Sequence, residues 1–164
     1  MIYRGKQVIA GAQLFVDRLI ECKVPFLFLT NNSEQTPLDL LRKIGAMGIM
    51  GLTEDNFITS AMATAAFLSA QNPGASAYVV GGAGLAAELY KVGFSITESN
   101  PDYVVVGKTT HFNFDMLRKA SRLIREGAKF IGTNPDVLDP VESGWEPTWD
   151  RSTSVRSSAR SFQR

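Results

Sequence analysis

The chain has 164 residues, of which 45% are hydrophobic and 20% charged, as is usual for a globular protein. It contains a single Cys, which excludes an internal disulfide framework and a Cys-rich zinc site. Its apolar runs are too short to span a membrane, and a cytoplasmic protein is expected.

Charge is distributed unevenly along the chain. Residues 1–150 carry 13 basic and 16 acidic side chains, whereas residues 151–164 carry four Arg and no acidic residue. A mildly acidic body is not typical of a nucleic-acid-binding protein. The Ser- and Arg-rich end is expected to be a solvated, disordered tail rather than an arm that binds nucleic acid or membrane.

Residues 11–22 have the apolar spacing of an amphipathic helix, and its expected buried face is formed by Leu14, Phe15, Leu19 and Cys22. The next apolar run, residues 24–29, is uninterrupted and short. Such a run is typical of a parallel strand that is buried on both faces.

The segments that follow continue this alternation of helix and strand. Thr36 and Pro37 predict the start of a helix that ends near Gly45 or Gly48, and Ser60 is the expected cap of the next long helix. Strands are predicted at 57–59, 78–80, 94–97, 103–106 and 129–131, and further helices at 60–70, 85–92 and 114–125. The order predicts an α/β fold with a mainly parallel sheet. No helix or strand is predicted after Asp136.

Polar residues end the strand at 24–29. Thr30, Asn31, Asn32 and Ser33 follow it directly. In open α/β sheets ligands bind beyond the carboxyl ends of strands, and a helix N-terminus nearby favours anions. A phosphate site is one interpretation, and a polar turn in which these side chains only satisfy the backbone is the other.

A second candidate is the glycine-rich turn Gly82-Ala83-Gly84, which follows a strand and opens a helix. This matches the G-x-G-x-x-G/A pattern of dinucleotide-binding proteins. The acid expected further along is poorly placed, because Asp102 precedes its strand and Glu98 comes too early. A tight turn that needs glycine for its own geometry is the simpler interpretation. The lone His111 does not predict a metal site.

Several motifs in order resemble the NagD-like (class IIA, C2-capped) phosphatases of the haloacid dehalogenase (HAD) superfamily. They are Leu29–Ser33, Ile58–Thr64, Tyr78–Gly81, Pro101–Gly107 and Gly132–Asp136. The resemblance extends from residue 2 to about residue 147. It implies a Rossmann-like core interrupted by an α/β cap, with 1–72 as part of the core, 73–147 as most of the cap and 148–164 as a divergent tail.

The same resemblance implies roles for four residues. Thr30 corresponds to the family's second motif, whose hydroxyl binds the transferring phosphoryl group, and Asn31 lies beside it. Asn134 and Asp136 correspond to a cap loop that faces the active site. Small phosphorylated metabolites, such as a nucleotide or a sugar phosphate, are the implied substrates, and Mg²⁺ is the implied cofactor.

The catalytic motifs of the family are missing from the sequence. The first motif, Asp-x-Asp-Gly, supplies the nucleophile and the general acid/base in the family, and it does not occur in this chain. The third-motif Lys and the fourth-motif carboxylates for Mg²⁺ lie beyond the cap in the family. We therefore expect no catalytic residues and no metal ligands here, and a catalytically incomplete phosphatase homologue.

Three hypotheses follow for the chain as it stands. It is a truncated, frame-shifted or pseudogene-derived product, or its missing core is supplied by another chain, or it is a non-catalytic module that binds a phosphate or a dinucleotide. The oligomeric state is open.

Overall fold

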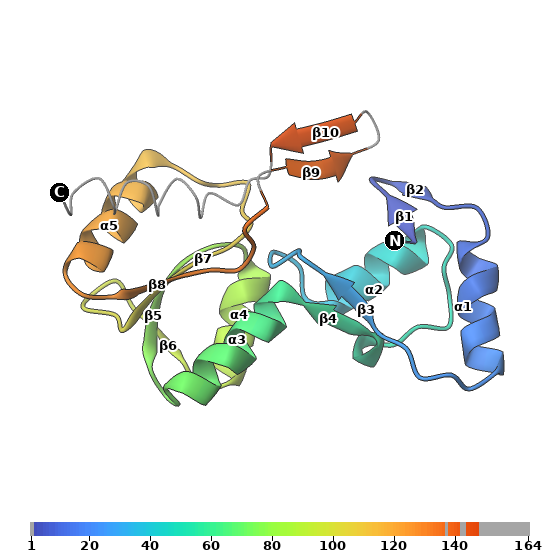
Figure 1. Ribbon diagram of the computed structural model, residues 1–164, viewed down its shortest axis with the longest axis horizontal. Coiled ribbons are helices and arrows are strands. Elements are labelled where there is room, and N and C mark those ends of the chain that lie inside the picture. The colour runs from blue at the N-terminus through green and yellow to red at the C-terminus, as the bar shows by residue number, and fades with distance from the viewer. Residues whose placement is uncertain (1, 137, 142–143, 148–164) are drawn as a thin grey trace.

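Figure 1 shows the computed structural model of the chain, which describes residues 2–136, 138–141 and 144–147. The elements in chain order are β1 (Tyr3–Arg4), β2 (Gln7–Val8), α1 (Ala12–Glu21), β3 (Phe28–Thr30), α2 (Pro37–Ala46), the 3-10 helix η1 (Glu54–Asn56), β4 (Phe57–Thr59), α3 (Ser60–Gln71), β5 (Ser76–Val80), α4 (Ala83–Lys91), β6 (Ser95–Ile96), β7 (Tyr103–Val106), α5 (Phe114–Arg125), β8 (Lys129–Gly132), β9 (Leu138–Val141) and β10 (Gly144–Pro147). The predicted α/β class with parallel sheets is confirmed.

The larger sheet contains four parallel strands in the order β6-β5-β7-β8. One face is covered by α3 and α4, whose Ala65, Leu68 and Leu89 pack against Ala77 and Val105. The other face is covered by α5, through Ala120 and Leu123. The sheet is therefore buried on both faces, as the apolar sequence of β7 requires.

The smaller sheet is the parallel pair β3–β4, in which Phe28, Leu29 and Thr30 face Phe57, Ile58 and Thr59 respectively. Helices α1 and α2 cover only one of its faces. Phe28 and Phe57 point into this core, with their ring centroids 5.9 Å apart. Figure 1 shows this group beside the larger sheet, with α3 leading from one to the other.

Most of the predicted elements are confirmed within one to three residues, but two hairpins were missed. The β1–β2 hairpin turns at Gly5, which has a φ of 59°, and β9–β10 is a second antiparallel pair. Their strands have four residues or fewer, too short for a clear alternation of apolar and polar residues.

The predicted division at residue 72 and the tail at 148–164 stay predictions, and the tail lies outside the described residues.

The predicted buried face of α1 is wrong. Ala12 and Val16 are the buried residues of this helix, whereas Leu14, Phe15 and Cys22 are exposed. Helix α1 contacts the small sheet through a narrow stripe, and the more apolar side of the helix is not covered by any described residue. The apolar spacing identified the helix but not the side on which it packs.

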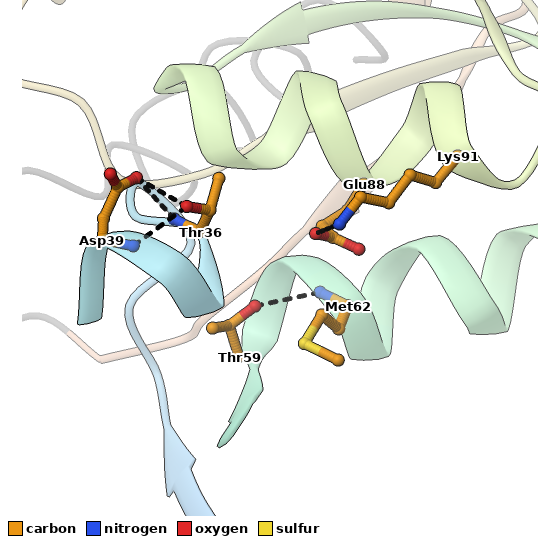
Figure 2. Close-up of polar contacts among 6 residues, drawn as sticks. All are labelled: Thr36, Asp39, Thr59, Met62, Glu88 and Lys91. Carbon is orange, nitrogen blue, oxygen red and sulfur yellow. Dashed lines mark hydrogen bonds and ion pairs between the residues drawn. The ribbon is translucent and has the colours of Figure 1, made fainter. Parts of the chain in front are cut away.

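The N-terminus of α2 is closed by its own cap, as Figure 2 shows. The Thr36 hydroxyl accepts from the Asp39 N–H, and the Asp39 carboxylate accepts from the Thr36 N–H at 3.0 Å. The Thr36 hydroxyl also donates to the Asp39 carboxylate at 2.7 Å, and this bond, together with the one from the Thr36 N–H, lowers the pKa of the Asp39 carboxyl. The same figure shows Thr59, not Ser60, capping α3: its Oγ1 accepts from the Met62 N–H at 3.2 Å.

Acid is expected to weaken the start of the larger sheet. The Asp102 carboxylate accepts from both the N–H (2.8 Å) and the hydroxyl (2.7 Å) of Ser76, and these bonds lower its pKa. A pKa that is lower in the folded chain stabilises the fold above the unfolded value of about 3.9, and this contribution disappears as the pH falls through the folded value. Asp102→Asn should therefore reduce stability more at pH 7 than at pH 2.5, as measured by urea unfolding.

The matched control for this measurement is Asp55→Asn, in an exposed Asp of η1. Its effect should be small and should not share the pH dependence of Asp102→Asn. If Asp102→Asn were equally destabilising at both pH values, the ionised carboxylate would not be the source of the stabilisation.

Candidate functional site

The loop that follows β3 is shaped by its own side chains. The Thr30 hydroxyl accepts from the Asn32 N–H at 3.2 Å, and Asn32 Oδ1 accepts from the Glu34 N–H at 2.8 Å. The Asn32 carboxamide also donates to Gln35 Oε1 at 3.0 Å. Thr30 and Asn32 therefore order the turn, and Asn31 is left exposed at its tip.

The loop after β8 meets this tip. Asn31 Nδ2 donates to Asp136 Oδ2 at 2.8 Å across 105 residues of sequence. Asn134, which is only 6% exposed, accepts from the Asp136 N–H through its Oδ1 at 2.9 Å and so shapes the second loop. The structure thus brings together the two pairs of residues, Thr30 with Asn31 and Asn134 with Asp136.

Ser60 joins the same site from the start of α3. Its hydroxyl donates to the Asn31 carbonyl oxygen at 2.8 Å. The predicted capping role of Ser60 is wrong, since Thr59 caps α3 and the Ser60 hydroxyl binds the backbone of Asn31 instead. Nothing in the local sequence indicates this contact, because 29 residues separate the two groups.

A second connection between the loops is made by Ser33, which is completely buried. Ser33 Oγ accepts from the Lys108 N–H at 2.8 Å, and the Thr133 hydroxyl donates to it at 3.2 Å. These partners follow β7 and β8, at the carboxyl ends of strands in the larger sheet. Ser33 therefore holds the loop of the smaller sheet against the larger one.

The glycine-rich turn at 82–84 packs against the β3–α2 loop. The Gly84 N–H donates to the Glu34 carbonyl oxygen at 3.0 Å. A Cβ on Gly84 would lie 2.6 Å from that oxygen, and one on Gly82 would lie 2.5 Å from the Cγ of Glu34. This close approach explains both glycines without a dinucleotide, because the Glu34 backbone lies where a pyrophosphate would have to approach.

The donors for an anion differ from those expected. The sequence predicted that the free N–H groups of the helix after β3 would contribute, but Thr36 and Asp39 cap that helix. The side chains of Thr30 and Asn31 are the remaining candidates at the loop tip. The Asp136 carboxylate is hydrogen-bonded to Asn31, and its negative charge would repel a phosphate bound at this position.

The described residues do not match a magnesium site. Mg²⁺ is held mainly by carboxylate and phosphate oxygens in octahedral geometry. Asp136 contributes one carboxylate, which Asn31 already engages. Nowhere in residues 2–136, 138–141 and 144–147 do three His, Cys, Asp or Glu side chains form a group suited to a metal ion.

A hollow of about 600 Å³ lies between α3 and β8, close to the loops. Ser60 and Thr133 line it together with Thr64, and Phe67 and Phe130 provide its aromatic surface. Its volume falls in the range of small-molecule pockets. No helix in the described part of the chain is both long enough and apolar enough to cross a bilayer.

Residues 1–95 match the family described as haloacid dehalogenase-like hydrolase. The chain belongs to the haloacid dehalogenase-like hydrolases. This family match includes Thr30, Asn31 and the β3–α2 loop, so the predicted relationship to NagD-like HAD phosphatases is confirmed.

Individual relatives narrow the group within the HAD-like hydrolases. The chain is 40% identical over 163 residues to an acid sugar phosphatase of Staphylococcus epidermidis. The aligned region covers 99% of this chain and 62% of the relative. The chain is 45% identical over 129 residues to the ribonucleotide monophosphatase NagD of Escherichia coli, with 79% of this chain and 51% of the relative covered.

A solved structure gives the same result at the level of the HAD fold. The glycerol phosphate phosphatase of Mycobacterium tuberculosis, solved in complex with magnesium, superposes with a TM-score of 0.88 at 28% identity. The match covers 98% of this chain and 49% of that chain. The chain thus spans between 49% and 62% of the length of these relatives.

Proposed function

We propose that this chain carries the phosphate-binding side of a phosphomonoesterase that acts on a small phosphorylated metabolite. The observation that carries the proposal is the contact between Asn31 and Asp136 at 2.8 Å, which joins the loop after β3 to the loop after β8. In this proposal Thr30 and Asn31 bind the phosphate, and Asn134 and Asp136 contact the rest of the substrate. Residues 1–72 then form part of a core, and residues 73–147 form most of a cap.

The activities of the relatives support the substrate class. The relatives are an acid sugar phosphatase, a ribonucleotide monophosphatase and a glycerol phosphate phosphatase. A polar substrate with hydroxyl groups suits a loop that presents the Asp136 carboxylate beside a carboxamide. A nucleotide or sugar phosphate in the cytoplasm remains the predicted substrate.

Hydrolysis by this chain alone is not part of the proposal. Phosphoryl transfer requires a positioned nucleophile and neutralisation of the phosphate charge. The sequence has no Asp-x-Asp-Gly motif, and the carboxylate at the site is engaged by Asn31. Thr30 can orient a phosphoryl group but cannot replace these two functions.

Inorganic phosphate binding measured by calorimetry tests the two loops separately. Asn31→Ala should weaken binding about tenfold, because it removes a donor to a charged group. Asp136→Asn should strengthen binding about fivefold, because a carboxylate within roughly 4 Å of the anion costs about 1 kcal/mol even in water. Asn72→Ala, in an exposed Asn at the end of α3, is the matched control and should change nothing.

Equal affinities of all these variants would contradict the assignment of the site. An aryl phosphate assay with Mg²⁺ addresses catalysis independently. Clear turnover by the purified chain would show that it is catalytically complete, whereas binding without turnover is the expected result. A thermal shift with NAD but none with a phosphomonoester would favour the dinucleotide hypothesis.

A further inference from the structure

We infer that the hollow between α3 and β8 binds the base of a nucleoside monophosphate, so that a nucleotide rather than a sugar phosphate is the ligand of this chain. The inference deepens the proposed function and rests on it for the position of the phosphate. The volume of the hollow, about 600 Å³, exceeds what a single phosphate group occupies. A site built for phosphate alone would leave this space unfilled.

The first argument is that the hollow and the proposed phosphate site share a wall. Ser60 lines the hollow, and its hydroxyl donates to the Asn31 carbonyl oxygen at 2.8 Å. Thr133 lines the hollow from the other side, and its hydroxyl donates to Ser33 Oγ at 3.2 Å. Asn31 and Ser33 both belong to the loop that follows β3. A ligand whose phosphate lies at Thr30 and Asn31 can therefore place its remaining part in the hollow.

The second argument is the chemistry of the side chains from α3. Ser60, Thr64 and Phe67 are three or four residues apart, so they share one face of this helix, and all three line the hollow. The Phe67 side chain is 54% exposed, which leaves aromatic surface open to a ligand. None of the described lining residues is ionisable. An uncharged base can stack on such a side chain, whereas a sugar phosphate has no aromatic ring to stack.

The third argument is the backbone of β8, which pairs only with β7 among the described strands. The N–H groups of Lys129 and Thr133 donate to carbonyl oxygens in or next to β7, both at 2.9 Å. In a parallel pair, alternate residues bond to the same neighbour, so the backbone groups of Phe130 and Gly132 point away from β7. Both of these residues line the hollow. The edge of a base carries donors and acceptors that such N–H and C=O groups can bind.

Calorimetric titration of the purified chain with AMP, adenosine, ribose 5-phosphate and inorganic phosphate tests the inference. AMP should bind about tenfold more tightly than ribose 5-phosphate, which has the same sugar and phosphate but no base. Phe67→Ala should weaken AMP binding about tenfold, as expected when one base loses its stacking partner, and should leave ribose 5-phosphate within about twofold. AMP, but not ribose 5-phosphate, should also slow the amide hydrogen exchange of Phe130 and Gly132, as measured by NMR.

Phe114→Ala is the matched control, since Phe114 is 74% exposed at the start of α5 and does not line the hollow. It should leave every affinity within about twofold of the original chain. The thermal unfolding of each variant alone establishes that both fold.

The outcomes separate the base site from the phosphate site. Equal affinities for AMP and ribose 5-phosphate, tighter binding of ribose 5-phosphate, or equal weakening by the two Phe variants would each overturn the inference. If inorganic phosphate still binds through Asn31, the proposed function stands in each of these cases. Equal binding of AMP and adenosine through Phe67 would instead support the base site and overturn the phosphate site.

Discussion

Replacing Gly84 by Ala is expected to lower the free energy of unfolding by about 3 kcal/mol, the upper end for overpacking at a buried site. The added Cβ would lie 2.6 Å from the Glu34 carbonyl oxygen and 2.8 Å from the Gln35 carbonyl carbon. Both are backbone atoms, so no side-chain rotation can relieve the contact. The Gly84 N–H would also lose its 3.0 Å bond to Glu34.

Gly45→Ala is the matched control for this substitution. Gly45 lies inside α2, and its added Cβ would meet no atom within 4 Å. Ala is a better helix former than Gly, so this variant should gain about 0.5–1 kcal/mol. Urea unfolding gives both values. A shift of both variants in the same direction would contradict the close packing of α4 on the β3–α2 loop.

The Gly84 substitution should also have a local signature. The Glu34 backbone would have to move away from α4, and the loop that carries Asn31 would move with it. Amide hydrogen exchange at residues 31–36 should therefore increase more than exchange in β7, in which every residue is buried. A uniform increase over the whole chain would indicate global destabilisation without this local link.

Ser33→Ala is expected to cost about 2 kcal/mol, because it leaves a buried donor without its acceptor. Ser33 is completely buried, and its hydroxyl oxygen accepts from the Lys108 N–H at 2.8 Å. The Thr133 hydroxyl would lose the same acceptor. The lost hydrogen bonds connect the two sheets, since Lys108 and Thr133 both follow strands of the larger sheet.

Ser95→Ala is the control, because Ser95 is exposed at the start of β6, and surface substitutions usually stay within about 0.5 kcal/mol. Ser33→Ala should also weaken phosphate binding, since the loop that carries Thr30 and Asn31 is no longer fixed. A variant as stable as the original chain, with unchanged phosphate affinity, would show that the Ser33 contacts are dispensable.

Both substitutions act on one structural relationship, the packing of the β3–α2 loop on the carboxyl ends of the larger sheet. Gly84 packs against Glu34 of this loop, Ser33 of the loop is hydrogen-bonded to Lys108 and Thr133, and the Asn31–Asp136 bond lies at the loop tip. The proposed phosphate site therefore depends on the relative position of the two sheets. Stability and phosphate affinity should change together in variants of this loop.

Local signals predicted the individual elements well. Thr36 and Pro37 predicted the start of α2, and the structure has a capping box there. The apolar runs predicted β5 and β7 because strands buried on both faces need no alternation. The motif order around Thr30 and Asn134 led to the correct family, since it combines short patterns far apart in the sequence.

Contacts between distant segments could not be predicted in this way. The sequence offered capping as the role of Ser60 and a nucleotide turn as one role of Gly84, and the structure assigns both to packing against the loop after β3. A hydroxyl or a glycine has several local uses, and the partner that selects among them lies tens of residues away. The exposed sides of α1 and β3 were mispredicted for the same reason.

By itself, therefore, the sequence determined the α/β class, the positions of most helices and strands, and the relationship to HAD-like phosphatases, because these depend on local propensity and ordered motifs. Only the tertiary structure decided that Asn31 and Asp136 meet, that Ser33 and Gly84 fix their loop, and that Leu29 stays uncovered. Those outcomes depend on which surfaces face each other, and burial is a property of the assembled elements rather than of any single segment.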